Sequence, residues 1–308
     1  MAFVHKSVLF QESIDALNPQ PSGIYMDLTA GGGGHSAAIL DRLGDGRLIC
    51  VDQDPDAIAV LRERFAGRSN VTVVQSNFSR VQAILEELDL PGVDGVLMDI
   101  GVSSYQLDTP ERGFSFHSDA PLDMRMSRSG RSAADVVNGC SEQELRRILR
   151  DYGEERFAAA IAREIVRRRE HRRIETTFEL IDAVKAAMPA AAQRDGHPAR
   201  RTFQAIRIEV NNELGVLSDT LDSAFDALHP HGRLAVITFH SLEDRMVKTR
   251  FAQFCQGCTC PKDFPVCVCG KKPRGRLVFK SKAPTAQELA DNPRSHSARL
   301  RCIEKLEF

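Results

Sequence analysis

Short apolar runs alternate with helix-like segments across residues 23–100, and this alternation constrains the fold more than any other feature of the chain. The apolar runs are rich in β-branched and aliphatic residues, as is typical of strands that are buried in a parallel sheet. They lie at residues 23–28, 47–52, 71–75 and 93–99. The segments between them, which have the pattern of helices, lie at residues 34–43, 55–65 and 79–88. Strands that alternate with helices predict a parallel sheet with right-handed crossovers.

This alternation stops after Asp99 and resumes near residue 208. Residues 105–201 carry helix and loop patterns without a convincing strand, and Ser141 with Glu144 has the spacing of a capping box. The other helices predicted in this part of the chain cover residues 157–169 and 177–188. An inserted helical domain is therefore expected at residues 105–207.

Residues 208–308 return to the α/β pattern. An apolar stripe over 210–228 and a second segment at 241–254 predict helices. Strands are predicted at residues 232–239, 276–281 and 298–306. The fold class predicted is a doubly wound seven-stranded α/β sheet, built from residues 1–104 and 208–308 and interrupted by the all-helical insertion.

Four consecutive glycines, Gly31 to Gly34, connect the first predicted strand to the first predicted helix. Glycine permits positive φ and lets a ligand approach the backbone where a Cβ would stand in the way. Asp52 ends the second strand about 20 positions later, where a carboxylate can accept hydrogen bonds from ribose hydroxyls. The pattern predicts a nucleotide-cofactor site. The glycine spacing alone is weak, because Ser36 occupies the third position of the dinucleotide pattern, and a tight turn without a ligand is the alternative.

Details around the glycines favour S-adenosylmethionine over a nicotinamide dinucleotide. Asp27 ends the first strand, where its carboxylate would repel a pyrophosphate but could meet the cationic amino group of a methionine moiety. Asp54 and Pro55 follow Asp52 and open the next helix, and Phe78 follows the third strand and offers an aromatic face for adenine. Asp99 ends the fourth strand at the carboxyl edge of the sheet, where ligands of such folds bind.

Composition and charge are those of a soluble globular protein, with 42% hydrophobic and 27% charged residues and a net charge of −1. No apolar run approaches the roughly 18 residues of a membrane span. The N-terminus lacks signal-peptide architecture, which predicts a cytoplasmic location and no membrane partner.

Two stretches are locally basic. Residues 146–173 hold ten arginines against five acidic residues, which is compatible either with nucleic-acid binding or with a solvated helix surface that carries internal ion pairs. Residues 270–282 hold six basic residues and no acidic one, which favours a phosphate-contacting surface.

Several long motifs resemble those of the bacterial 16S ribosomal RNA cytosine-N4 methyltransferase family. They occur in the family's order over essentially the whole chain, at residues 5–9, 33–36, 98–108, 111–116, 121–126, 152–157, 201–207, 237–245 and 292–295. The resemblance implies S-adenosylmethionine as cofactor, the 16S rRNA of the small ribosomal subunit as partner, and a cytidine of the decoding region as methyl acceptor. The donor-binding residues that it implies are Gly33, Gly34, His35, Asp52, Phe78, Asp99 and Gln106. It assigns no role to His5, His240 or Glu243, and it leaves the oligomeric state open.

The exocyclic amine of cytosine is a poor nucleophile, because its lone pair is delocalised into the ring. Hydrogen-bond acceptors that face its N–H groups would localise that pair. Asp99 is the candidate catalytic residue for this task, with the backbone carbonyls of residues 100–102 as the alternative. Phe114, Phe116 and Tyr105 could stack on an unstacked base, although core packing is the simpler expectation for them.

Five cysteines crowd into residues 255–269, which departs from the family's shared pattern. Cys255, Cys258, Cys260, Cys267 and Cys269 offer enough thiolates for a tetrahedral zinc ion, but the spacing is not that of a standard zinc finger. Bound zinc and reduced thiols both remain open, and no metal ligand is assigned.

Other functions compatible with the sequence are methylation of another RNA or of DNA, and ribosome assembly by an RNA-binding factor whose donor pocket is vestigial. A dehydrogenase is a third alternative.

Overall fold

The computed structural model describes residues 7–194, 196–261, 266 and 268–307. His5, at the start of one motif, and Cys267, in the cysteine segment, lie outside the described residues. The chain divides into two compact units, Met1–Gly101 with Gly215–Phe308, and Val102–Leu214. The sequence-based domain limits lie at 104/105 and 207/208, three and seven residues from the boundaries of these units at 101/102 and 214/215.

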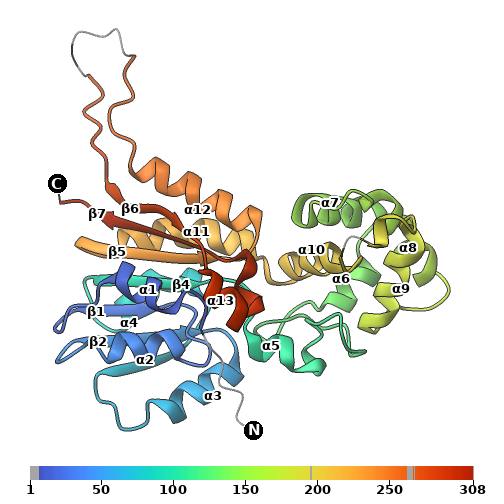
Figure 1. Ribbon diagram of the computed structural model, residues 1–308, viewed down its shortest axis with the longest axis horizontal. Helices are drawn as coiled ribbons and strands as arrows, with labels where there is room; N and C mark the ends of the chain where they lie inside the picture. Colours follow the sequence, from blue (N-terminus) through green and yellow to red (C-terminus); the bar gives the residue numbers. More distant parts are fainter. Residues whose placement is uncertain (1–6, 195, 262–265, 267, 308) are drawn as a thin grey trace. The chain divides into compact units, whose positions relative to one another are not determined.

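The first unit contains a seven-stranded sheet with the strand order β3-β2-β1-β4-β5-β7-β6 (Figure 1). The strands are β1 (Ile24–Asp27), β2 (Arg47–Asp52), β3 (Val71–Gln75), β4 (Val93–Asp99), β5 (Leu228–Thr238), β6 (Gly275–Lys282) and β7 (Arg299–Lys305). The first five strands pair in parallel, whereas β7 lies between β5 and β6 and is antiparallel to both. The predicted seven-stranded α/β fold class is confirmed.

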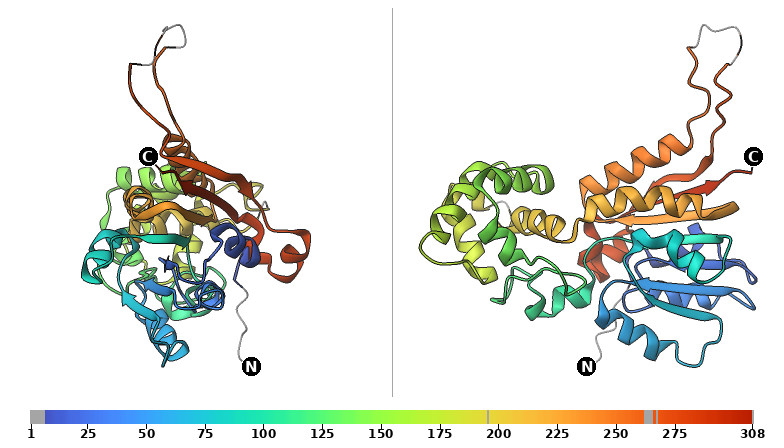
Figure 2. Two further views of the ribbon diagram at one scale, coloured as in Figure 1. Left: turned by 90° about the vertical axis from the view of Figure 1, so that its left-hand side faces the viewer. Right: turned by 180° about the vertical axis from the view of Figure 1, so that it is seen from behind.

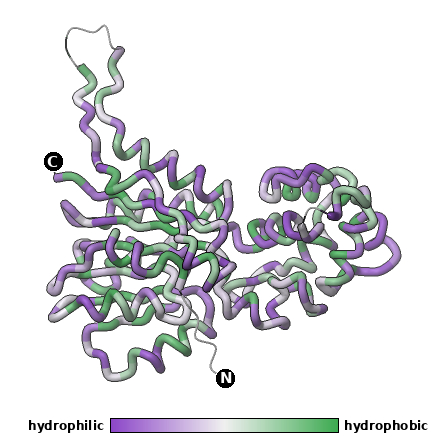
Figure 3. The backbone as a smooth tube through the Cα atoms, in the orientation of Figure 1, coloured by the Kyte–Doolittle hydropathy of each residue, from purple (hydrophilic) through white to green (hydrophobic). Residues whose placement is uncertain are grey.

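Helices cover both faces of this sheet (Figure 2). On one face, α1 (Phe10–Leu17), α2 (Gly34–Leu40) and α3 (Pro55–Arg64) share a hydrophobic core with Tyr25, Leu48 and Leu97 of the strands. On the other face, α4 (Val81–Glu87), α11 (Glu213–Asp226) and α12 (Ser241–Phe254) pack on Met26, Val51 and Met98. Hydrophobic stretches accordingly run along the strands in Figure 3.

Two α-helices of this unit's described residues have no counterpart in the sequence-based prediction, α1 and the short helix α13 (Ala286–Asp291). The first residues of the helix predicted over 210–228 belong to a different helix. The helix α10 (Arg200–Asn211) covers them and is followed by Asn212, which adopts a left-handed conformation with φ 47°. The helix α11 begins only after Asn212. A left-handed residue interrupts an α-helix, so a continuous apolar stripe here spans two helices.

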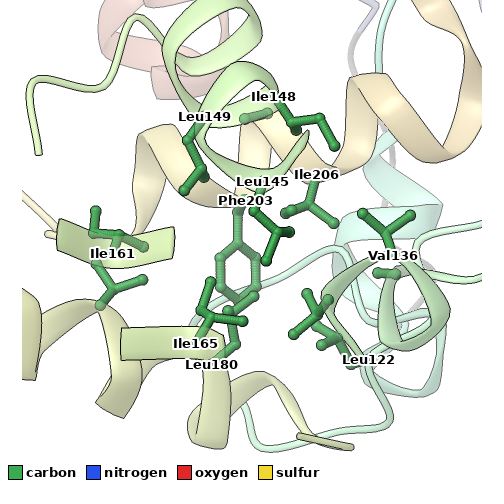
Figure 4. Close-up of a cluster of buried hydrophobic side chains, with 14 of the residues drawn as sticks. Leu122, Val136, Leu145, Ile148, Leu149, Ile161, Ile165, Leu180, Phe203 and Ile206 are labelled. Carbon is green, nitrogen blue, oxygen red and sulfur yellow. The ribbon is translucent and has the colours of Figure 1, made fainter. Parts of the chain in front are cut away.

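The second unit is helical, as the sequence predicts. Its helices are α5 (Ser104–Asp108), α6 (Ala133–Gly139), α7 (Glu142–Gly153), α8 (Ala158–Arg169), α9 (Thr177–Ala187) and α10. Ser141 and Glu144 form the predicted capping box of α7. Phe203 of α10 lies among leucine and isoleucine side chains from α7, α8 and α9, which gives this unit its own core (Figure 4). Within the described residues, no helix has both the length and the apolar character needed to cross a membrane.

Candidate active site

Three aspartates end three neighbouring parallel strands. Strand β1 pairs with β2 on one side and with β4 on the other, and the three strands end at Asp27, Asp52 and Asp99. The carboxyl ends of parallel strands meet at one edge of a sheet, and this edge is where open α/β sheets bind ligands. The predicted cofactor residues of the first unit gather around this edge.

The glycine turn follows β1 and has the conformation for which glycine is suited. Gly31 and Gly33 have φ of 50° and 77°. A Cβ on Gly34 would lie 2.2 Å from Oγ of Ser7, and one on Gly33 would lie 3.1 Å from side-chain atoms of Leu61 and Arg64. Backbone conformation and packing thus both require glycine at Gly33, while packing alone requires it at Gly34.

Asp52 holds the glycine turn from the neighbouring strand. Its Oδ2 accepts a hydrogen bond from the Gly31 N–H at 2.8 Å, and its Oδ1 accepts one from the Asp54 N–H at 2.8 Å. A carboxylate has about four acceptor positions, so both oxygens can still accept a hydroxyl. Burial raises the pKa of Asp52, and the two backbone N–H groups oppose that shift. The geometry suits recognition of a vicinal diol such as ribose.

Asp27 is 1% exposed, and its carboxylate is turned into the loop. One oxygen accepts a 2.6 Å hydrogen bond from Oγ of Ser36, and the other accepts a 3.2 Å bond from the Thr29 N–H. Burial raises its pKa to about 6. These contacts show that Asp27 holds the turn. Its predicted contact with a methionine amino group stays a prediction.

His35 connects the N-terminal segment to the site. Its buried ring lies with Nε2 3.2 Å from the carbonyl oxygen of Val8 and Nδ1 3.7 Å from Oδ2 of Asp99. Because a carbonyl oxygen only accepts hydrogen bonds, Nε2 carries a proton. The other ring nitrogen, Nδ1, faces Asp99. The Phe10 ring stacks on His35 at 5.8 Å between centroids and fixes the ring plane.

Asp99 differs from the other two aspartates because one of its oxygens has no partner. Its Oδ1 is buried and accepts no hydrogen bond from the part of the chain that the structure describes. The side chain nevertheless retains 23% exposure. Burial raises the pKa of Asp99 to about 8, and the carboxylates of Asp27 and Glu243 reinforce the shift. An unpartnered oxygen on a carboxyl group that opens to solvent is a candidate contact to a ligand.

Glu243 and His240 have a structural role. Together they cap α12: the Phe239 and His240 N–H groups donate to Oε2 of Glu243, at 2.8 and 3.2 Å, and Nδ1 of His240 accepts from the Glu243 N–H. Glu243 is 2% exposed and adds negative charge near Asp99. The sequence alone does not reveal this cap, because histidine is an unusual N-cap residue.

Thr29 is a site residue that the sequence analysis missed. Its Oγ1 accepts a 2.6 Å hydrogen bond from the Asp99 N–H, which ties the end of β4 to the glycine turn. Its position two residues after Asp27, at the start of the glycine turn, is the sequence signal that could have suggested it.

The remaining predicted residues have different surroundings. Phe78 begins the 3₁₀ turn Phe78–Arg80 after β3 and packs partly against the core of the first unit. Gln106 belongs to the second unit, where its Oε1 accepts from the Ser103 N–H as the cap of α5. Contacts of these two side chains with a methyl donor stay predictions.

Of the aromatic residues proposed to stack on a base, Phe114 is buried in the core of the second unit, at 5% exposure. Phe116 stacks on His197 at 4.3 Å, and Tyr105 is 54% exposed. Core packing therefore accounts for Phe114.

The chain was compared with known proteins. It matches the model of the MraW methylase family over residues 2–306. It is 54% identical over 311 residues to the ribosomal RNA small subunit methyltransferase H of Lachnospira eligens, with 99% of each chain covered. The protein of the same name from Symbiobacterium thermophilum is 54% identical over 312 residues, with 100% of this chain and 98% of that protein covered. The structure of an rRNA methylase from Streptococcus thermophilus gives a TM-score of 0.43 at 11% identity, covering 99% of this chain and 100% of that one.

The two sequence matches span nearly the full length of this chain and of the relatives, so they carry the assignment. They confirm the resemblance inferred from the motifs and the identification of the protein as an enzyme. The chain belongs to the MraW methylase family.

Proposed function

We propose that the protein transfers a methyl group from S-adenosylmethionine to the exocyclic N4 of a cytidine in the decoding region of 16S rRNA. Membership of a methylase family and the names of its full-length relatives support the reaction class and the small-subunit rRNA substrate. The observation that carries the atomic part of the proposal is the unpartnered oxygen of Asp99 at the edge of the sheet, beside the glycine turn. We also infer that the protein acts in the cytoplasm, where an rRNA substrate is found.

The residues at this edge fit the methyl donor. S-adenosylmethionine supplies a methyl group that is made electrophilic by a sulfonium, together with a ribose and an adenine that a protein can bind. Asp52 would accept from the ribose hydroxyls, because its two oxygens are fixed by backbone N–H groups and retain acceptor positions. Gly33 and Gly34 would contact the ligand through backbone atoms of the turn, and Phe78 would contact the adenine. His35 and Gln106 complete the set that we propose.

Asp99 would act on the amine of the base. Its oxygens would accept hydrogen bonds from the N4–H group and so localise the nitrogen lone pair. The ionised carboxylate is the stronger acceptor. Since the pKa of Asp99 is raised to about 8, the group can also take up a proton that the amine loses once it is methylated. The Asp99 N–H donates to Thr29, so the end of β4 that carries the carboxyl group is held in place.

Basic residues that would hold RNA are fewer than their number in the sequence suggests. In the second unit, Glu164 pairs with Arg167 and Arg168, and Arg150 pairs with Asp151, so internal ion pairs account for part of that arginine-rich stretch. Arg146, Arg156 and Arg163, by contrast, are exposed.

Near β6, the expectation that the basic residues lack acidic partners is wrong for two of them. Arg274 pairs with Asp226 and Arg276 with Glu304. Lys271, Lys272 and Lys280 are the basic residues there that we propose for phosphate contact. All three lysines are exposed, and Lys280 lies in β6.

The test is incubation of the purified protein with labelled S-adenosylmethionine and small ribosomal subunits that lack the modification. The expected result is label in 16S rRNA, located at N4 of a single decoding-region cytidine by mass spectrometry of nuclease fragments. Label at another nucleotide would contradict the proposed target. Binding of subunits without any incorporation would leave only an assembly role, and incorporation into free DNA would point to a different substrate.

A further inference from the structure

The cysteine segment forms two arms between α12 and β6. One arm leaves the end of α12 at Phe254, and the other returns to β6 at Gly275. In Figures 1 and 2 the described parts of the arms run side by side away from the sheet. Nothing in the proposed methyl transfer uses these residues.

The base of the arms is held together by several contacts. The Arg274 N–H donates to the carbonyl of Phe254 at 2.8 Å, and the Arg274 guanidinium lies over the rings of Phe225 and Phe254, at 5.3 and 5.6 Å from their centroids. Further out, a Cβ on Gly257 would lie 3.3 Å from Cδ of Pro273, so the two arms are in contact there. The contact between the arms therefore limits the distance between the cysteines that lie further out on each arm.

Three thiols meet just beyond this contact. Cys258 and Cys260 come from the outgoing arm and Cys269 from the returning arm, and their Sγ atoms all lie within 4.8 Å of one another. The Sγ atoms of Cys258 and Cys269 are 3.7 Å apart. A disulfide requires a separation of about 2.05 Å. Two sulfurs that bind one zinc ion tetrahedrally, with Zn–S bonds of about 2.3 Å, are instead separated by about 3.8 Å.

We propose that Cys258, Cys260 and Cys269 bind a zinc ion that joins the two arms. The 3.7 Å separation of the Cys258 and Cys269 Sγ atoms matches that of zinc-bound thiolates, and the Cys260 Sγ lies within 4.8 Å of both. Soft thiolate ligands select zinc among the common divalent cations. The remaining position of the tetrahedron is filled by a water molecule or by another ligand of the chain. Cys258 and Cys269 are exposed and Cys260 is half-buried, so the ion can reach the thiols from solvent.

The charges near the cluster favour this site. Lys271 and Lys272 follow Cys269 in sequence and are exposed. Nearby ammonium groups stabilise thiolates over thiols, and three thiolates with one Zn²⁺ carry a net negative charge that these lysines offset. Zinc binding displaces the thiol protons into solution.

The structural consequence of the ion is a link between the two arms. A zinc ion bound by Cys258 and Cys260 on one arm and by Cys269 on the other would join the arms, and would hold Lys271 and Lys272 in one arrangement. A phosphate-contacting surface benefits from this, because less conformational entropy is then lost on binding.

Metal analysis of the full chain tests the proposal. The protein is expressed with zinc in the medium, purified under reducing conditions without a chelator, and analysed by mass spectrometry for metals. The expected content is about one zinc per chain, falling at least about tenfold in Cys258→Ser and Cys269→Ser. Cys255→Ser is the matched control, because Cys255 lies in the same segment but outside the cluster and packs against the core of the first unit. It should retain the metal.

Cobalt and protease measurements provide independent readouts. Cobalt(II) added to metal-free protein should produce thiolate charge-transfer and tetrahedral ligand-field absorption in the wild type and in Cys255→Ser, but not in Cys258→Ser. Free zinc at ten times its Kd should slow tryptic cleavage after Lys271 about tenfold. Circular dichroism of each variant establishes that it is folded.

Three results would overturn the proposal. One is zinc content below about a tenth of an ion per chain in the folded wild type. Another is equal zinc content in wild type, Cys258→Ser and Cys269→Ser. The third is a disulfide between Cys258 and Cys269 in protein kept under reducing conditions. Activity on ribosomal subunits is not needed for any of these readouts, so they are independent of the proposed methyl transfer.

Discussion

The ends of β2 and β4 show how the same residue type is prepared for two different tasks at one sheet edge. Asp52 and Asp99 both end parallel strands, and burial raises the pKa of each. Both oxygens of Asp52 accept backbone N–H groups, which favour its ionised form. Asp99 has an oxygen without a partner among residues 7–194, 196–261, 266 and 268–307, and the carboxylates of Asp27 and Glu243 raise its pKa further. Backbone donors thus prepare Asp52 for binding, while Asp99 can change its protonation state near neutral pH.

The largest difference between substitutions of Asp99 and Asp52 is expected in the rate of methyl transfer. Asp99→Ala should lower the single-turnover rate of methyl transfer at saturating donor by about 10²–10⁴-fold, because it removes the acceptor for the amine protons. Rapid-quench measurement with labelled donor and small subunits gives the rate. A near-normal rate would refute the assignment of Asp99.

Asp52→Ala should instead weaken binding of the donor. Hydrogen bonds to a charged group contribute about 1.5–3 kcal/mol each, so the Kd for S-adenosylmethionine should rise by about 10–100-fold while the rate at saturation changes less. Calorimetry measures the Kd of the folded variant. If Asp52→Ala reduced the saturated rate as strongly as Asp99→Ala does, the division of tasks would be wrong.

The pH dependence of the rate sharpens the comparison further. Ionised Asp99 is the stronger acceptor, and its pKa is about 8. The single-turnover rate should therefore rise with pH, by at most about tenfold per unit, and level off above pH 8. Asp99→Asn should show a flatter profile at a lower rate. An equally steep profile in this variant would assign the titration to another group.

The smallest effect concerns stability. Asp99 binds its proton more tightly in the folded protein than in the unfolded chain, where its pKa is 3.8. Its contribution to stability is full below that value and is lost as pH rises through the folded pKa of about 8. Asp99→Asn removes this loss, so the free energy of unfolding should fall less between pH 4 and pH 8 than in the wild type, by on the order of 1 kcal/mol or more. Urea titrations at several pH values measure it, and parallel curves for both proteins would argue against a raised pKa.

The first four strands were predicted from sequence to within a residue or so, because apolar runs of this length are a local signal. The positions of Asp52 and Asp99 at strand ends follow from the same signal. The hydrogen bond from Ser36 to Asp27 and the contact of His35 with the Val8 carbonyl were not predictable in this way. They depend on how the glycine turn folds back and on where the segment before α1 lies, and α1 itself was missed. The break between α10 and α11 was not predictable either, because the left-handed Asn212 does not change the hydrophobic pattern.

The position of β7 sets a condition on how the protein is made. Strand β7 lies between β5 and β6, although both precede it in the chain. A ribosome that synthesises the protein from its N-terminus therefore produces β5 and β6 before the strand that must separate them. Neither can complete its pairing until synthesis has passed Lys305. Until then the exposed edge of β5 must be kept from pairing with β6 or with another chain. The completed sheet thus forms only after β7 has been made, although the four strands that carry the cofactor edge can assemble earlier.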